Sequence, residues 1–141
     1  MPFAKTMADE VETVHLKSAA DWEAFANRVD KGEVTLNAVM DNDIDLGDCQ
    51  AMVGNSHYYE GTFDGQGHTL TVHYNFENIN NCAPFRQVNG TTIKNLIIEG
   101  EIVGNREDGI DTQIGGIIGL PLSIYQQPSK TSYISNCAVY A

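Results

Sequence analysis

The residues most able to do chemistry are four carboxylates that fall close together in the chain: Asp41, Asp43, Asp45 and Asp48. Three of them occupy alternate positions, so a strand here would carry them on one face, because successive side chains of a strand point to opposite faces. Clustered carboxylate oxygens suit Ca²⁺. The spacing is not that of an EF-hand loop, since Leu46 stands at the turn-glycine position and Met52 at the position of the bidentate Glu. The run therefore predicts either a solvated outer face or a calcium site of low affinity.

A further carboxylate, Asp64, lies within the glycine-rich run Gly61–Leu70, which reads GTFDGQGHTL. Hydrolysis of a glycosidic bond needs two carboxylates, about 5 to 5.5 Å or about 6.5 to 9.5 Å apart, and the sequence selects no partner for Asp64. An Asp that precedes Gly in a turn commonly accepts a hydrogen bond from its own backbone. We therefore interpret Asp64 as a turn former, and as the catalytic candidate if the protein is an enzyme.

Histidines and cysteines show no metal-site pattern. His68 and His73 have a spacing that a zinc site could use, but no CxxC pair accompanies them, and their odd separation predicts opposite faces of a strand. Cys49, Cys82 and Cys137 are far apart and odd in number, so we interpret them as small apolar side chains of the fold. Apart from calcium, the sequence predicts no cofactor.

Composition limits the classes of partner. A chain of 141 residues is long enough for one domain with a sizeable core. The formal net charge of −11, from 19 acidic and 8 basic residues, argues against nucleic acid and anionic membrane surfaces. No apolar run approaches the roughly 20 residues that span a bilayer. The first residues lack the apolar stretch of a signal peptide, so we expect a cytoplasmic protein or a mature or excised domain.

One helix is predicted near the start of the chain, after a tail at residues 1–10 that we expect to be disordered and a short strand at 11–16. Ser18 is the predicted N-cap, Asp21 lies in the first turn, and Gly32 is the stop. One face of the helix is apolar: Trp22, Phe25, Ala26 and Val29. This face must be buried, and the remaining sequence is strand-like. We therefore expect the helix to cover the open end of a β structure.

The rest of the chain repeats one pattern, a glycine- or asparagine-bearing turn followed by an apolar run. Candidate strands at 34–40 and 42–46 precede it. Turn positions are expected at Gly61, Gly65, Gly67, Gly90, Gly115, Gly116 and Gly119.

The spacing of the repeats predicts a parallel β-helix. Leu70 and Ile93 are 23 residues apart, which suits one coil of a β-solenoid, and Phe63 and Phe85 are separated by nearly as many. The 41 residues from Ile93 to Ile134 suit two coils, with a strand at 116–118 between them. We expect about four coils over residues 33–141, capped by residues 11–32. An antiparallel sandwich is the competing interpretation.

Several segments in this order resemble one protein family. They are GTFDGQGHTL at 61–70, APFRQVNGTTIKNL at 83–96, GGIIG at 115–119 and ISNC at 134–137. They resemble the GLUG-type repeat proteins of the bacterial surface, common in gut Bacteroidetes and Firmicutes, with the pattern GtFDGqGHtI … PFr.v.gatIkNL … GGivG. The helix and the DIDL segment at 43–46 resemble that family too. The chain departs at 70–73, where the family's asparagine is missing.

The resemblance implies a right-handed parallel β-helix, as a fragment of a larger secreted, anchored or adhesin-like protein, and no established catalytic residues. Three functions remain open. The first is a non-catalytic extracellular module that contacts glycans or host and cell-surface proteins, or serves structural display. The second is a polysaccharide-active enzyme of pectate-lyase-like fold, and the third is a module that associates with itself through an open C-terminal edge.

Overall fold

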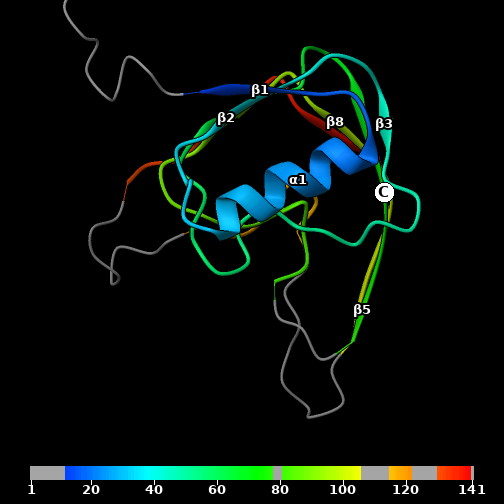
Figure 1. Ribbon diagram of the computed structural model, residues 1–141. Coiled ribbons are helices and arrows are strands. Elements are labelled where there is room, and N and C mark those ends of the chain that lie inside the picture. The colour runs from blue at the N-terminus through cyan, green and yellow to red at the C-terminus, as the bar shows by residue number, and fades with distance from the viewer. Residues whose placement is uncertain (1–11, 78–80, 106–114, 122–129, 141) are drawn as a thin grey trace, which may run out of the picture.

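Residues 12–77, 81–105, 115–121 and 130–140 are described in the computed structural model of this chain (Figure 1). They form one α-helix, α1 (Ala19–Asp30), and eleven strands. The described part of the protein is therefore mostly β. The tail predicted at 1–10 lies outside it.

The strands form three sheets, and every pairing between described strands is parallel. The five-stranded sheet has the order β1 (Thr13–Leu16), β2 (Asn37–Met40), β4 (Thr62–Asp64), β7 (Thr92–Lys94), β10 (Tyr133–Ser135). The four-stranded sheet has the order β11 (Ala138–Tyr140), β8 (Ile97–Asn105), β5 (Thr69–Glu77), β3 (Ile44–Asp45). The two-stranded sheet pairs β6 (Phe85–Val88) with β9 (Ile118–Pro121). The antiparallel sandwich is therefore wrong.

After α1 the chain visits the three sheets in a fixed rotation. A strand of the five-stranded sheet is followed by one of the four-stranded sheet, and then by β6 or β9. Before β4, the place of a strand in the third sheet is taken by two isolated parallel bridges, Val53 to Phe85 and Tyr59 to Val88. Each return of the chain thus adds one layer of strands beside the previous layer.

The register of these layers differs from the predicted spacing. Phe63 pairs with Ile93 and Leu70 with Ile98, whereas Phe85 belongs to a different sheet from Phe63. The predicted matches of Leu70 with Ile93 and of Phe63 with Phe85 are wrong. All these positions are apolar and inward-facing, so the sequence pattern does not distinguish one sheet from another.

The last interval is also corrected. Ile134 pairs directly with Ile93, so the segment between them is one return of the chain and not two. The strand β9 falls within that return, on the two-stranded sheet. The interval is long because it includes residues 106–114 and 122–129, which lie outside the described ranges.

The predicted helix is confirmed at both ends. The Ser18 side chain accepts a hydrogen bond from the Asp21 backbone N–H, and Lys31 is the C-cap. Gly32 follows with φ 111°, a backbone angle that favours glycine. The predicted apolar face is the buried one: Trp22, Phe25, Ala26 and Val29. The predicted strands at 11–16, 34–40 and 42–46 are shorter in the structure, as β1, β2 and β3.

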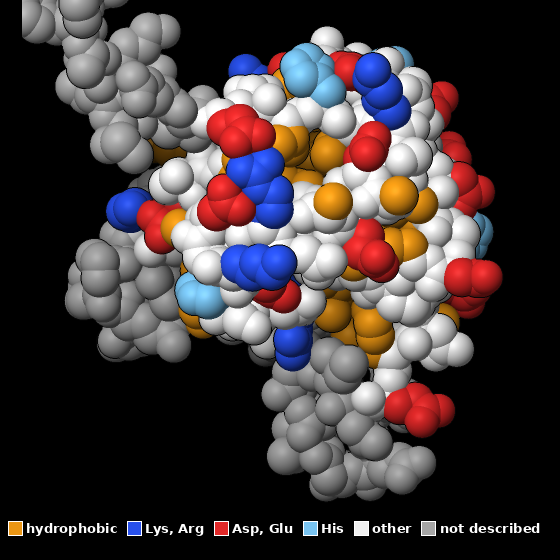
Figure 2. Space-filling model, viewed as in Figure 1, with side chains coloured by type: hydrophobic (Ala, Val, Ile, Leu, Met, Phe, Trp, Pro, Cys, Tyr) orange, Lys and Arg blue, Asp and Glu red, His pale blue; other side chains and the backbone are white. Residues whose placement is uncertain are grey.

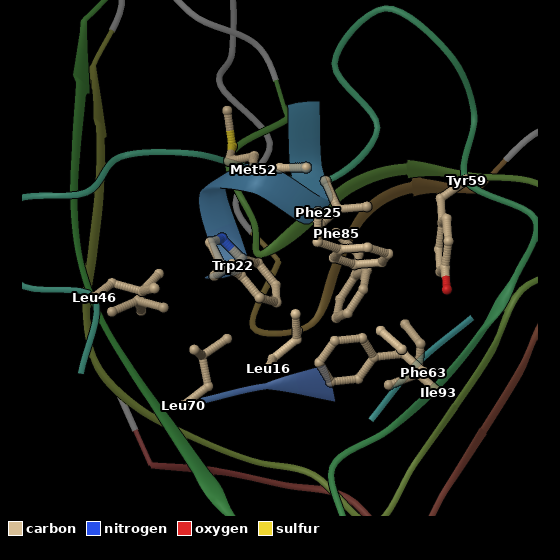
Figure 3. Packing of buried hydrophobic residues seen from close by; sticks show 14 of the residues in the cluster. Leu16, Trp22, Phe25, Leu46, Met52, Tyr59, Phe63, Leu70, Phe85 and Ile93 are labelled. Carbon is tan, nitrogen blue, oxygen red and sulfur yellow. The ribbon is translucent and has the colours of Figure 1, made fainter. Parts of the chain in front are cut away.

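The helix packs its apolar face on the inward side chains of the sheets. Figure 1 shows α1 crossing the space between β2 on one side and β3 on the other. The Trp22 ring meets the edges of Phe63 and Phe85, with centroids 5.8 and 5.7 Å apart, and its Nε1–H donates to the Ala51 carbonyl at 2.9 Å. Figure 3 shows these rings converging with aliphatic side chains, including Leu16, from other strands. The core is therefore shared by the helix and all three sheets.

The predicted turn glycines divide into two kinds. Gly67 and Gly90 have φ of 81° and 72° and are required by the backbone angle. Gly61 and Gly65 are required by space, because a Cβ at Gly65 would meet the Asn95 carbonyl and the Leu96 Cα of the next layer. The same holds for Gly115 and Gly116, where a Cβ would meet the Ile118 carbonyl and the Val139 side chain. Gly119 lies inside β9, so its assignment to a turn is wrong.

Candidate functional site

In the five-stranded sheet, side chains alternate between the buried inner face and a polar outer face. In β4 and β7 the central residues Phe63 and Ile93 are buried, and their neighbours are half-buried. Parallel pairing places Thr62 beside Thr92 and Asp64 beside Lys94. Asp64 was predicted as a candidate from the sequence, and Lys94 was not. The signal that could have identified Lys94 is its place in the repeat at 92–96, directly before Asn95.

A shallow hollow of about 240 Å³ lies on this outer face, across β1, β2, β4 and β7. Its outward-facing lining consists of Thr13, Asn37, Val39, Thr62, Asp64 and Lys94. Hydroxyl, amide, ammonium and carboxylate groups are therefore gathered on a flat parallel sheet. Such a set can donate to and accept from the hydroxyl groups of a sugar, while the sheet offers a broad surface.

Asp64 acts as a turn former, as predicted. Its Oδ1 accepts from the Gln66 backbone N–H at 2.9 Å and from the Asn95 side-chain amide at 3.1 Å. Asn136 in turn donates to Asn95 Oδ1 at 2.7 Å. A ladder of polar side chains thus runs across three layers, from Asp64 to Asn136. Residues 70–73 take no part in it, because they lie in β5 of the four-stranded sheet.

Several donors in the hollow have no partner in the described part of the chain. The Lys94 ammonium makes no ion pair or hydrogen bond there. The Asn37 side chain accepts from the Thr62 backbone N–H at 2.8 Å through Oδ1, so its amide hydrogens remain available. The groups of the hollow can therefore both donate and accept, because Asp64 Oδ2 and the threonine hydroxyls remain as acceptors.

This arrangement lacks the pair of carboxylates that glycoside hydrolysis uses. Of the residues that line the hollow, Asp64 is the one with a carboxylate, and Lys94 lies beside it. General acid/base hydrolysis requires a second carboxylate about 5 to 9.5 Å away. The lining residues therefore supply one of the two carboxylates, together with hydroxyl, amide and ammonium groups that can form hydrogen bonds with a sugar.

The carboxylate run at 41–48 lies on the outside, as its alternation predicts. Asp43 and Asp45 are exposed, and the intervening Ile44 is buried. Figure 2 shows acidic side chains along the edge of the molecule on the side where Figure 1 labels β3.

Three histidines pair with these carboxylates. His15 Nδ1 lies 3.0 Å from Asp41, His68 Nδ1 lies 3.2 Å from Asp43, and His73 Nε2 lies 2.9 Å from Asp45. These pairs were not foreseen, because the partners are more than 20 residues apart and meet only through the sheet register. His68 precedes β5, so it shares the exposed row with His73, and the prediction of opposite faces is wrong.

Backbone donors reinforce two of these carboxylates. The Thr69 N–H donates to Asp43 and lowers its pKa, with a further contribution from His68. The Gly47 N–H does the same for the pKa of Asp45, with His73 contributing next. Among the described residues no three His, Cys, Asp or Glu side chains are grouped as a metal ion would need. Calcium binding by Asp41, Asp43, Asp45 and Asp48 stays a prediction.

Comparisons with protein-family models, with curated proteins and with solved structures returned no match. Within the described ranges, no helix has the length and apolar character needed to cross a membrane.

Proposed function

We propose that the chain is a non-catalytic β-solenoid module of a secreted or surface-attached bacterial protein, and that the outer face of its five-stranded sheet contacts glycans. In this proposal the solenoid is right-handed and has about four coils, with α1 as the cap of its N-terminal end. The resemblance to GLUG-type repeats supplies the extracellular setting.

Three features support the solenoid. All sheets are parallel, the chain visits them in rotation, and equivalent positions stack in register, as in the ladder of Asp64, Asn95 and Asn136. Support for the cap comes from two observations. In the chain α1 directly follows β1, the edge strand of the five-stranded sheet that lies opposite β10. Trp22 and Phe25 of α1 pack on the core.

The observation that carries glycan contact is the hollow on the outer sheet face. Sugars present rows of hydroxyl groups, and the hollow offers the Thr13 and Thr62 hydroxyls, the Asn37 amide hydrogens and the Lys94 ammonium on a parallel sheet. A site on strands keeps its geometry better than a site on loops, which reduces the entropy lost on binding. The net charge of −11 favours a neutral glycan over a polyanionic one.

The experiment measures binding of a panel of neutral and acidic glycans by glycan array, followed by calorimetry. We expect millimolar to micromolar binding to at least one neutral glycan. Lys94→Met and Thr62→Val should weaken it about five- to fifty-fold, as each removes about one net hydrogen bond, with more lost for the charged donor. The matched control is Lys31→Met, at the exposed C-cap of α1.

Equal binding by Lys94→Met, Thr62→Val and the control would place glycan contact elsewhere. The enzyme alternative is tested on the same panel with and without Ca²⁺. Cleavage that disappears in a folded Asp64→Asn variant would replace the proposal with a polysaccharide-active enzyme, because that substitution keeps the turn but removes the charge.

A further inference from the structure

The outward side chains of the hollow form two rows that run across the strands of the five-stranded sheet. Parallel pairing sets equivalent residues of successive layers side by side, so each layer contributes one member to a row. The first row contains Thr13, Asn37 and Thr62, and the second contains Val39, Asp64 and Lys94. The first row is uncharged, and both charges of the hollow lie in the second.

The hollow is longer across the strands than along them. Its lining comes from four adjacent strands, β1, β2, β4 and β7, which together span about 14 Å at about 4.8 Å from one strand to the next. Along the strands, the two rows are two residues apart, which is about 7 Å. A linear ligand therefore makes the most contacts when it lies across the strands.

Asp64 and Lys94 are neighbours in the second row but do not pair with each other. Their Cα atoms are partners in the register of β4 and β7. Asp64 Oδ1 accepts from the backbone of Gln66 and from the side chain of Asn95. Asp64 Oδ2 and the Lys94 ammonium have no partner within the described ranges. A charged acceptor and a charged donor are thus both available at adjacent positions.

A vicinal diol matches this pair of groups. One of its hydroxyl groups donates to the carboxylate and the other accepts from the ammonium, so both protein groups gain a charge-assisted hydrogen bond. An acidic or basic group of a ligand would be attracted by one of the two and repelled by the other. The pair therefore favours a neutral sugar unit with two adjacent free hydroxyl groups.

We propose that the hollow binds a linear neutral oligosaccharide that lies across the strands, with a vicinal diol of one unit held between Asp64 and Lys94. This rests on the proposed function, because it names the ligand and its direction on the same sheet face. Thr13 lies three strands from Lys94, so it contacts a unit of the oligosaccharide that a disaccharide does not provide. The site then reads both the diol and the length of the sugar.

The test is calorimetry of the 141-residue chain with di- to hexasaccharides of β-1,4-linked glucose, mannose and xylose, whose internal units all carry a free vicinal diol. For at least one series, we expect the affinity to rise at least about ten-fold from disaccharide to tetrasaccharide and then to level off, since the hollow spans about 14 Å. Thr13→Val should weaken tetrasaccharide binding about three- to ten-fold and leave disaccharide binding unchanged. Asp64→Asn and Lys94→Met should each weaken binding at every length, by about five-fold or more.

Two controls accompany these variants. Thr71→Val makes the same substitution as Thr13→Val at an outward position of β5 in the four-stranded sheet, and it should leave all affinities unchanged. Lys31→Met serves for Lys94→Met, as above. Circular dichroism establishes that each variant is folded. If Asp64→Asn unfolds because Asp64 also forms the turn, Thr13→Val decides the outcome.

Tetrasaccharide binding that is unchanged in a folded Thr13→Val variant overturns the proposal, because the sugar then does not reach across the strands. Equal or tighter binding by a folded Asp64→Asn variant also overturns it, since no hydroxyl group then donates to this carboxylate. In either case, weaker binding by Lys94→Met and Thr62→Val would leave glycan contact at this face standing. Absence of binding to all three series overturns the inference, and the wider glycan panel then decides the proposed function.

Discussion

The segment 92–96 and the segment 133–137 have nearly the same local structure and opposite environments. Each is a three-residue strand followed by an asparagine in the left-handed region, with φ of 54° at Asn95 and 51° at Asn136. Yet Ile93 is fully buried and Ile134 is 48% exposed. The difference lies outside the segments, because the first has a layer on both sides and the second on one. Local sequence decides the conformation here, and the neighbouring layer decides the burial.

The first prediction compares a large aromatic side chain of α1 with one of the last strand, β11. Trp22→Ala should destabilise the protein by about 3 to 5 kcal/mol, because the ring is fully buried between the helix and the sheets. Tyr140→Ala, at 66% exposure, should change stability by about 0.5 kcal/mol or less. Urea unfolding measures both changes in stability. Equal losses would contradict the difference between the ends.

The second prediction uses the matched isoleucines. Ile93→Ala should cost about 2 to 5 kcal/mol, since it opens a cavity between two layers. Ile134→Ala should cost about 1 kcal/mol or less, because solvent already reaches the side chain. The same unfolding experiment applies. A loss at Ile134 as large as that at Ile93 would mean that another layer covers it in solution.

The third prediction separates the two reasons for glycine in the turn before β5. Gly65→Asn should cost about 1 to 3 kcal/mol, because the new side chain is forced against the backbone at Asn95 and Leu96. Gly67→Asn should be nearly neutral, since its φ is 81°, asparagine tolerates this region, and the space around it is open. Thermal unfolding distinguishes them. The reverse order would show that backbone angle, not contact between layers, constrains Gly65.

The fourth prediction sharpens the comparison along the polar ladder. The Asn95 side chain makes two hydrogen bonds of the ladder, because it donates to Asp64 and accepts from Asn136. The Asn136 side chain makes one, as the donor to Asn95. Substitution by glycine keeps the positive φ and removes the amide. Asn95→Gly should therefore cost about 1 to 3 kcal/mol and Asn136→Gly about 0.5 to 1.5 kcal/mol. Urea unfolding gives both values, and a larger loss at Asn136 would argue against the ladder.

The fifth prediction concerns pH and has the smallest expected effect. The pKa values of Asp43 and Asp45 lie below their ordinary value of 3.8 in the folded protein. Their charged forms therefore add stability above pH 3.8, and this is lost as the pH falls through the lowered values. The strands β10 and β11 contain no carboxylate. Between pH 5 and 3, protection of the Thr69 and Gly47 amides from hydrogen exchange should fall more than that of β10 and β11.

Asp43→Asn is the control for the pH experiment. It should remove the pH dependence at the Thr69 amide and leave that at Gly47, whose acceptor is Asp45. A uniform loss of protection across all strands would instead indicate global acid unfolding, with no special role for Asp43 and Asp45.

The helix and the alternation of the strands could be predicted because they depend on neighbours in sequence. Ser18, the four apolar positions of α1 and Gly32 suffice to place the helix, and the alternating aspartates place Asp43 and Asp45 outside. The register could not be predicted. Each return of the chain has a different length, so the apolar pattern that matched Phe63 to Phe85 was as good as the true match to Ile93.

The candidate site was predicted in one residue and missed in the others. Asp64 was recognised by its turn, but Lys94, Asn37 and Thr13 come from three further strands and meet it only through parallel pairing. The histidine partners of the carboxylate run were missed for the same reason. Long-range pairs of polar residues leave no periodic signal in the sequence.

By itself the sequence determined where strands and turns form, which side chains face inward, and that the protein is acidic. These follow from backbone angles, from period-two alternation and from composition, all of which act locally or by simple count. The tertiary structure alone decided which layer lies next to which. The order of the layers places Lys94 beside Asp64, and it brings His68 and His73 to their carboxylate partners. It also buries Ile93 and leaves Ile134 exposed. Burial and pairing depend on segments that are distant in the chain, so the local sequence does not determine them.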